Sequence, residues 1–224
     1  KQLWGNLGRV LGEFPHLSQI YAEADTRLVQ EGIEHVEQVR EACKPVIFVS
    51  GHFANWEMVI IGIQRLVGDT GAIYRHANNP YMEKWIIKQR GVFMPIPVMK
   101  GAEGAREMLT LLKKGIPLAA LIDQRLNTGD PITFFGRDTR APSAFVKLAR
   151  KLDVAIIPTR IIRRDDAADA IHFKQIFYPP IRVAQTDNMQ ADIDATMRQI
   201  YDMFEQWISE HPAEWFWAHN RWRD

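Results

Sequence analysis

Residues 46–57 read Val46-Ile47-Phe48-Val49-Ser50-Gly51-His52-Phe53-Ala54-Asn55-Trp56-Glu57, an apolar run followed by a turn and a helix start. The run 46–49 has the length and β-branched content of a buried strand. Gly51 permits a tight turn, and Asn55 can cap the helix that follows. His52 is then expected at the carboxyl end of the strand, where open α/β sheets bind their ligands.

Glu57 follows His52 with four residues between them. From the first turn of the next helix its carboxylate can hold the imidazole in one tautomer and stabilise the protonated form. A histidine at a strand end is more often structural, and this spacing arises by chance, so the pair alone leaves both roles open.

The remaining pattern alternates strands with helices. We expect strands at 46–49, 71–74, 118–122, 155–162 and 171–177, and helices at 55–66, 81–90, 103–114, 143–151 and 192–211. The N-terminal quarter is expected to be helical, 127–141 a Gly/Pro/Thr-rich loop, and 163–169 a charged turn. The alternation predicts an α/β fold in one domain, residues 1–224, with a mixed, mostly parallel central sheet flanked by helices.

Composition narrows the class of protein. A net charge of +1 argues against a nucleic-acid-binding surface, and Cys43 is the only cysteine, so no intrachain disulfide can form. No apolar stretch of about 18 residues is present. Because the chain starts at Lys1, we expect a fragment that lacks an N-terminal membrane anchor. The apolar residues of the first 14 positions suit a membrane surface, and core packing explains them equally well.

Four ordered blocks point to a known family. They are Gly51-His52-Phe53-Ala54-Asn55-Trp56-Glu57; Tyr74-Arg75-His76-Ala77-Asn78-Asn79-Pro80 with Gln89-Arg90-Gly91; Leu121-Ile122-Asp123-Gln124 with Phe134-Phe135-Gly136; and Ala141-Pro142-Ser143-Ala144 with Ile156-Ile157-Pro158. Together they resemble the lipid A biosynthesis acyltransferases, the lauroyl/myristoyl transferase family of Gram-negative envelopes.

The resemblance implies a glycerolipid-acyltransferase-like fold and a membrane-associated enzyme on the cytoplasmic face of the inner membrane. Such an enzyme moves a fatty acyl chain from acyl-acyl-carrier-protein to a hydroxyacyl chain of a lipid A precursor. No metal or organic cofactor is implied, and the histidine spacing differs from the zinc-binding His-Glu-x-x-His pattern. Two alternatives remain: a related acyltransferase using another glycolipid or a glycerophosphate acceptor, and a non-catalytic lipid-binding protein of this fold.

The same blocks supply candidate catalytic residues. His52 is the expected general base and Glu57 the residue that orients it. Asp123, which follows the strand 118–122, matches an aspartate that the family requires, and it is expected at the same sheet edge as His52. Its alternative role is a loop cap. Arg90 matches the family's required arginine, suited to a phosphate of the acceptor or to the geometry of the site.

Candidate substrate-binding residues surround these four. They are Arg75, Asn79, Gln124, Asn55, Trp56 and Phe53. For Asn79 a helix cap before Pro80 is the competing interpretation. The basic pairs Lys113-Lys114 and Arg137-Arg140 are a candidate surface for the acyl carrier protein. The aromatic tail 215–223 suits either a lipid headgroup zone or a packed C-terminal cap.

Overall fold

The computed structural model describes residues 1–42, 44–74, 77–91, 93, 96–99, 101–164 and 171–222. Its centre is a seven-stranded sheet in the order β1-β9-β8-β2-β5-β3-β4. The strands are β1 (Leu28–Glu31), β2 (Val46–Ser50), β3 (Gly71–Tyr74), β4 (Ile96–Met99), β5 (Leu118–Leu121), β8 (Ala155–Arg163) and β9 (Phe173–Phe177). Neighbours run parallel except for β8 and β9, which run antiparallel. The predicted mixed, mostly parallel sheet is therefore confirmed.

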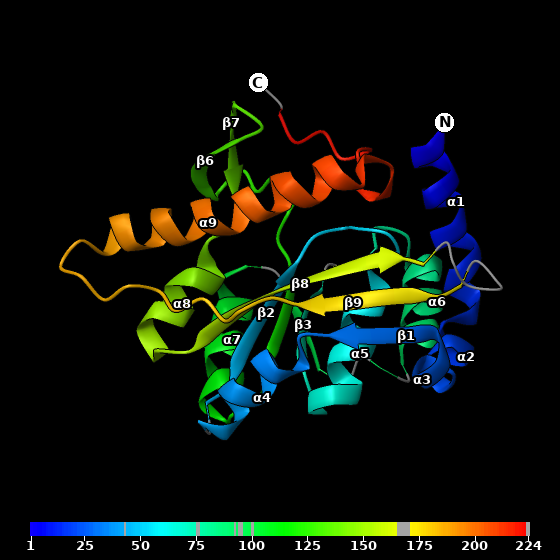
Figure 1. The fold of residues 1–224 in the computed structure, drawn as a ribbon, viewed down its shortest axis with the longest axis horizontal. Helices are drawn as coiled ribbons and strands as arrows, with labels where there is room; N and C mark the ends of the chain where they lie inside the picture. Colours follow the sequence, from blue (N-terminus) through cyan, green and yellow to red (C-terminus); the bar gives the residue numbers. More distant parts are fainter. Residues whose placement is uncertain are drawn as a thin grey trace.

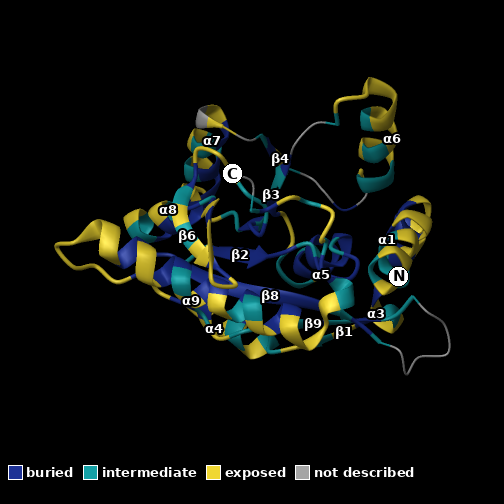
Figure 2. Cartoon of the chain, turned by 90° about the horizontal axis from the view of Figure 1, so that it is seen from above, coloured by how far each residue is buried: buried dark blue, intermediate teal, exposed yellow. Residues whose placement is uncertain are grey.

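Helices cover both faces of the sheet (Figure 1). One core cluster packs beneath α7 (Ala102–Lys113), α8 (Ala144–Leu152) and α9 (Met189–Glu210). The other packs beneath α2 (Leu17–Ala22), α4 (Ile33–Glu41) and α5 (Glu57–Val67). The described residues also form three more helices, α1 (Gln2–Glu13), α3 (Ala24–Arg27) and α6 (Pro80–Arg90), and the 3₁₀ turns η1 (Phe14–His16) and η2 (Pro212–Glu214). Figure 2 shows the central strands buried and the outer helix surfaces exposed.

Most expected elements are found within two or three residues of their predicted ends, but 127–141 is not a loop. It contains a separate hairpin, β6 (Asp130–Phe134) and β7 (Arg137–Ala141). The two-residue turn between the strands places Phe135 and Gly136 at positive φ, 51° and 69°, which matches the twist of a tight hairpin. The four-residue strands β1 and β4 at the two edges of the sheet were not predicted. Residues 165–169 of the expected charged turn lie outside the described residues.

The residues before α6 and α8 have different roles. Asn79 caps α6, because its side-chain oxygen accepts hydrogen bonds from Tyr81 N at 2.9 Å and Met82 N at 3.4 Å. The residue before α8 is Ser143, but its hydroxyl donates to Asp130 Oδ2 at 2.5 Å instead of capping the helix. The serine therefore ties the start of α8 to the hairpin.

Candidate active site

Two adjacent parallel strands bring the catalytic candidates together. β2 ends at Ser50 and β5 ends at Leu121, and these two residues are register partners. His52 and Asp123 each follow their strand by two residues, so both emerge at the same carboxyl edge. The predicted meeting of these two side chains at one sheet edge is confirmed.

The imidazole of His52 is held by Asp123. His52 Nδ1 lies 2.7 Å from Asp123 Oδ1, and the backbone N–H of His52 donates to Asp123 Oδ2 at 3.0 Å. Because an ionised carboxylate only accepts hydrogen bonds, Nδ1 carries the proton and Nε2 of the neutral ring has a lone pair. That tautomer leaves Nε2 able to accept a proton from a substrate.

Asp123 is ionised across the neutral pH range. Burial raises the pKa of this carboxyl, since only 2% of the residue is exposed. The positive charge of His52 and the hydrogen bonds from His52 and Trp215 outweigh burial and bring the pKa down to about 2. The carboxylate can therefore stabilise an imidazolium formed during a reaction.

Gly51 allows this close approach. A Cβ at this position would lie 2.7 Å from the Phe53 ring and 3.1 Å from both Cβ and Cγ of Asp123. A side chain here would push against the Phe53 ring and crowd the Asp123 side chain that holds His52. The glycine is thus favoured by the close packing of the Phe53 ring and the Asp123 side chain.

The prediction that Glu57 orients His52 is wrong. Glu57, on the first turn of α5, accepts hydrogen bonds from Arg90 Nε at 2.8 Å and from Arg90 Nη2. Arg90 is the last residue of α6, and its guanidinium also lies over the rings of Phe14 and Tyr74. Burial lowers the pKa of Arg90, but the charge and hydrogen bonds of Glu57 outweigh it, so the net pKa is raised. Glu57 meets Arg90 because α5 packs near the end of α6. The spacing between His52 and Glu57 in the sequence carries no information about that packing.

A cavity of about 230 Å³ opens beside the dyad. It is lined by His52, Trp56, Glu57, Val59, Ile60, Ala72, Ile73, Tyr74, Arg90, Ala119, Ala120, Leu121 and Gln124. The small side chains of Ala72 and Ala119, register partners on β3 and β5, leave space beneath α5. His52 and Gln124 supply polar groups next to the dyad, the Glu57–Arg90 pair adds charged ones, and Val59 and Ile60 of α5 form an apolar part of the wall.

Gln124 and Trp56, two of the predicted substrate-binding residues, lie next to His52 in the cavity. Gln124 Nε2 is 3.5 Å from His52 Nε2, and both residues line the cavity. The ring of Trp56 meets the His52 ring edge-on, with centroids 5.2 Å apart. These two predicted residues share the cavity with the base.

Three other substrate-binding predictions are not supported by the geometry. Phe53 packs in the opposite core, against the rings of Phe204 and Trp207, and is not among the residues that line the cavity. Asn55 is fully buried: its amide donates to Glu13 Oε2 at 2.7 Å, and its oxygen accepts from Glu57 N. Asn79 is used as the cap of α6.

Arg75 lies outside the described residues. Its predicted role in binding substrate therefore stays a prediction.

The C-terminal segment contributes a contact that the sequence did not predict. Trp215 Nε1 donates to Asp123 Oδ2 at 2.8 Å, and Trp215 is buried. Of the two alternatives for the tail, packing is found for Trp215, whereas Trp217 is 41% exposed. Only the abundance of aromatic residues at 215–222 hinted at a packed cap, and nothing in the pattern named Asp123 as its partner.

Within the described ranges, no group of three or more His, Cys, Asp and Glu side chains is arranged to hold a metal ion. Over the same ranges, no helix has both the length and the apolarity to cross a bilayer.

The chain belongs to the bacterial lipid A biosynthesis acyltransferase family, whose model matches residues 1–224. Phosphatidylinositol mannoside acyltransferase of Mycobacterium tuberculosis H37Rv is 24% identical over 195 residues, which are 85% of this chain and 58% of the relative. The protein of the same name from Mycolicibacterium smegmatis is 22% identical over 194 residues, 85% of this chain and 60% of the relative. The chain thus spans less than two thirds of these relatives.

The fold is also that of a glycerolipid acyltransferase. The 1-acyl-sn-glycerophosphate acyltransferase PlsC of Thermotoga maritima superimposes with a TM-score of 0.50 at 15% identity, covering 91% of this chain and 81% of PlsC. The expected glycerolipid-acyltransferase-like architecture is confirmed.

Proposed function

We propose that the chain transfers a fatty acyl group from acyl-acyl-carrier-protein to a hydroxyl of a hydroxyacyl chain on a lipid A precursor, with His52 as general base. The observation that carries this proposal is the His52–Asp123 pair at the mouth of a cavity with one apolar wall. Family membership supports acyl transfer as the reaction.

The chemistry needs one base and one oxyanion donor. The hydroxyl oxygen of the acceptor attacks the thioester carbonyl carbon as Nε2 of His52 removes the hydroxyl proton. Asp123 stabilises the resulting imidazolium, and the Gln124 amide, which lies beside Nε2, is the side-chain candidate for the oxyanion. Collapse of the tetrahedral intermediate breaks the C–S bond, and the imidazolium returns the proton to the thiolate.

The apolar wall suits the acyl chain. A chain of about 12 carbons gains roughly 0.8 kcal/mol per buried methylene, on the order of 9 kcal/mol in total. Trp56, Ile60 and Ala119 line the cavity next to the base, where the carboxyl-proximal part of the chain must lie. We place the donor's acyl group there and the acceptor hydroxyl at Nε2.

Arg90 acts on the geometry of the site in this proposal. Its two bonds to Glu57 fix α6 against α5 along one side of the cavity. Since the guanidinium also lines the cavity and carries five donors, binding of an acceptor phosphate remains part of the proposal.

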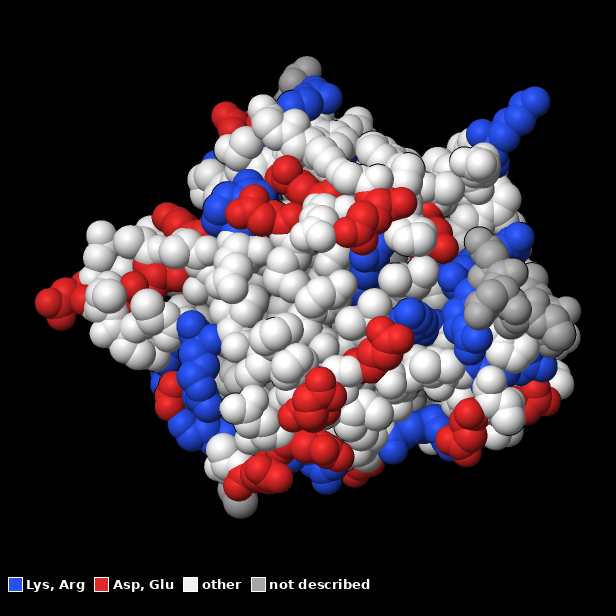
Figure 3. Space-filling model, viewed as in Figure 1, with Lys and Arg blue, Asp and Glu red and all other residues white. Residues whose placement is uncertain are grey.

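The proposed place of action is the cytoplasmic face of the inner membrane. Exposed apolar residues cluster on α1 and α6, which both contact η1: Trp4, Leu11, Tyr81, Met82, Trp85 and Ile87. Tryptophan and tyrosine favour the membrane interface. Figure 3 shows acidic and basic side chains interspersed on the face drawn, so no patch of one sign there marks a surface for an acidic carrier protein.

Product analysis tests the proposal. The purified protein is incubated with acyl-carrier-protein or coenzyme A thioesters and with three acceptors: a lipid A precursor, a phosphatidylinositol mannoside and lysophosphatidate. Mass spectrometry should show one added acyl chain on the lipid A precursor, with the carrier-protein donor preferred. His52→Ala should lower the rate by about 10²-fold or more while remaining folded.

The relatives favour a second candidate acceptor, a glycolipid of the mannoside type. If the protein acylates the mannoside and not the lipid A precursor, the mannoside becomes the acceptor in the proposal. No acylated product with any donor and acceptor pair would overturn the proposal as a whole.

A further inference from the structure

The C-terminal segment lies along the loop that carries His52. Trp215 forms an antiparallel bridge with Phe53, Phe216 N donates to His52 O at 3.0 Å, and Ala54 N donates to Glu214 O at 2.9 Å. These backbone bonds make residues 214–216 a short strand-like partner of residues 52–54. The loop that carries His52 is therefore paired with a segment more than 150 residues later in the sequence.

Trp215 reaches through this pairing to the carboxylate of Asp123. Its indole N–H is the third donor on Asp123, after the ring and backbone N–H groups of His52. The indole is packed edge-on against the rings of Phe134, Trp217 and Trp222. Its direction is set by this aromatic packing, so the donor is aimed at Oδ2 before any substrate arrives.

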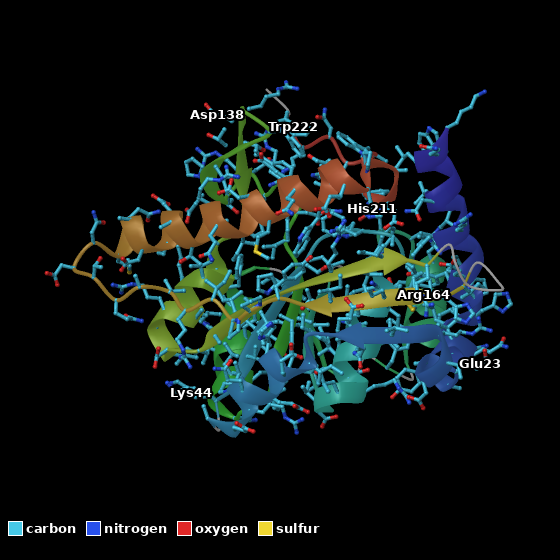
Figure 4. All side chains as sticks on the ribbon, in the orientation of Figure 1. Glu23, Lys44, Asp138, Arg164, His211 and Trp222 are labelled. Carbon is cyan, nitrogen blue, oxygen red and sulfur yellow. The ribbon has the colours of Figure 1, made fainter. Side chains whose placement is uncertain are left out.

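The rest of the segment anchors the same loop. Arg221 is fully buried and donates through Nη1 to the backbone carbonyl of Asp123. Thr139 of β7 donates to Arg221 O at 2.6 Å, and Trp222, beside the hairpin in Figure 4, donates to Phe134 O at 3.1 Å. Both the side chain and the main chain of Asp123 are thus held by residues beyond 214.

We infer that Trp215 is a positioning residue of the catalytic dyad, which fixes the Asp123 carboxylate so that Oδ1 faces Nδ1 of His52. The indole donor also sets how strongly Asp123 attracts the imidazole proton. A carboxylate that shares its charge with an N–H donor is a weaker base. Removing the donor should therefore stabilise the imidazolium and raise the pKa of His52.

Other charged or titratable groups surround the dyad and must be separated from this effect. Arg221 comes from the segment itself, Tyr201 from α9, and the Glu57–Arg90 pair from α5 and α6. Burial raises the pKa of Tyr201 to about 12, so it does not titrate near neutrality. His219 accepts from Arg125 N at 3.0 Å on the loop after Asp123, so its titration must be assigned separately.

The test replaces Trp215 by 3-benzothienylalanine, which keeps the ring shape but has sulfur in place of the N–H group. Trp215→Phe is the second variant. NMR titration of ring-labelled histidine, with the His52 and His219 signals assigned by His52→Gln and His219→Gln, gives the pKa of His52 without any substrate. Acyl-transfer rates, which depend on the function proposed above, are measured separately.

Both variants should raise the pKa of His52, because the carboxylate becomes a stronger base. They should still lower kcat by about 10-fold or more, because Asp123 no longer holds the imidazole in the orientation that Nε2 needs. Trp217→Phe is the matched control, because it removes the indole bond to the backbone carbonyl of Pro212 but keeps an aromatic ring beside Trp215. It should leave both quantities unchanged. A benzothienylalanine variant with an unchanged His52 pKa would overturn the inference, whether or not the rate falls, because packing alone would then explain Trp215.

Discussion

Two carboxylates lie beside the cavity, and each holds a different basic side chain. Asp123 follows β5 and binds His52, an imidazole that can accept and release a proton. Glu57 begins α5 and binds Arg90, whose charge is permanent. The first pair can take part in proton transfer, whereas the second can only fix two helices or hold an anion. The sequence analysis paired Glu57 with His52 because the two residues are close in sequence. In the structure, strand order gives Asp123 its partner and helix packing gives Glu57 its partner.

The largest expected effect is that of Asp123→Asn. The amide cannot stabilise the imidazolium and permits the wrong tautomer, so kcat should fall on the order of 10³- to 10⁴-fold. The measurement is the initial rate of acyl transfer with the preferred pair of substrates. A loss below tenfold in the folded variant would remove Asp123 from the dyad.

Glu57→Gln should act on stability more than on proton transfer. The change leaves the Arg90 guanidinium largely buried without its carboxylate, which destabilises the fold by about 3 kcal/mol or more. Urea unfolding measures this loss, and the pH–rate profile should keep the acid limb of the wild type. A shifted acid limb of the pH–rate profile, with unchanged stability, would instead show that Glu57 orients His52.

The fold could be predicted further than the site. The strands at 46–49, 71–74 and 118–122 could be predicted because they are apolar runs bounded by turn residues. Parallel strands end at the same edge of a sheet, so the sequence also predicted that His52 and Asp123 lie close together. The hairpin at 130–141 escaped prediction because its strands are polar and half-exposed. Trp215 and Arg90 reach their partners over 92 and 33 residues. Such contacts depend on how distant segments pack, and no local pattern encodes them.

The acid stability of the two regions should also differ. The folded-state pKa of Asp123 is lowered to about 2, so its contribution is fully present above the ordinary aspartate pKa near 4. That contribution, on the order of 2 kcal/mol, is lost as the pH falls from about 4 through 2. Urea unfolding of wild type and Asp123→Asn should give free energies that converge over this window. A constant difference down to pH 2.5 would contradict the lowered pKa.

The smallest expected effect separates two neighbouring aromatic residues. Trp56 lines the cavity and Phe53 lies in the opposite core. Trp56→Leu should therefore change the ratio of rates on short and long acyl donors, while Phe53→Leu should cost about 1 kcal/mol of stability and leave that ratio unchanged. Competition between two donor chain lengths, read by mass spectrometry, measures the ratio. Equal ratios in both variants would place the acyl chain elsewhere.

The central claim is that Asp123, and not Glu57, holds the imidazole of His52. The most direct measurement is the proton NMR signal of the His52 Nδ1–H group, which a short bond to a carboxylate moves downfield and protects from exchange. The signal should be present in the wild type and in Glu57→Gln, and absent in Asp123→Asn and His52→Gln. A signal that persists in Asp123→Asn and disappears in Glu57→Gln would contradict the account.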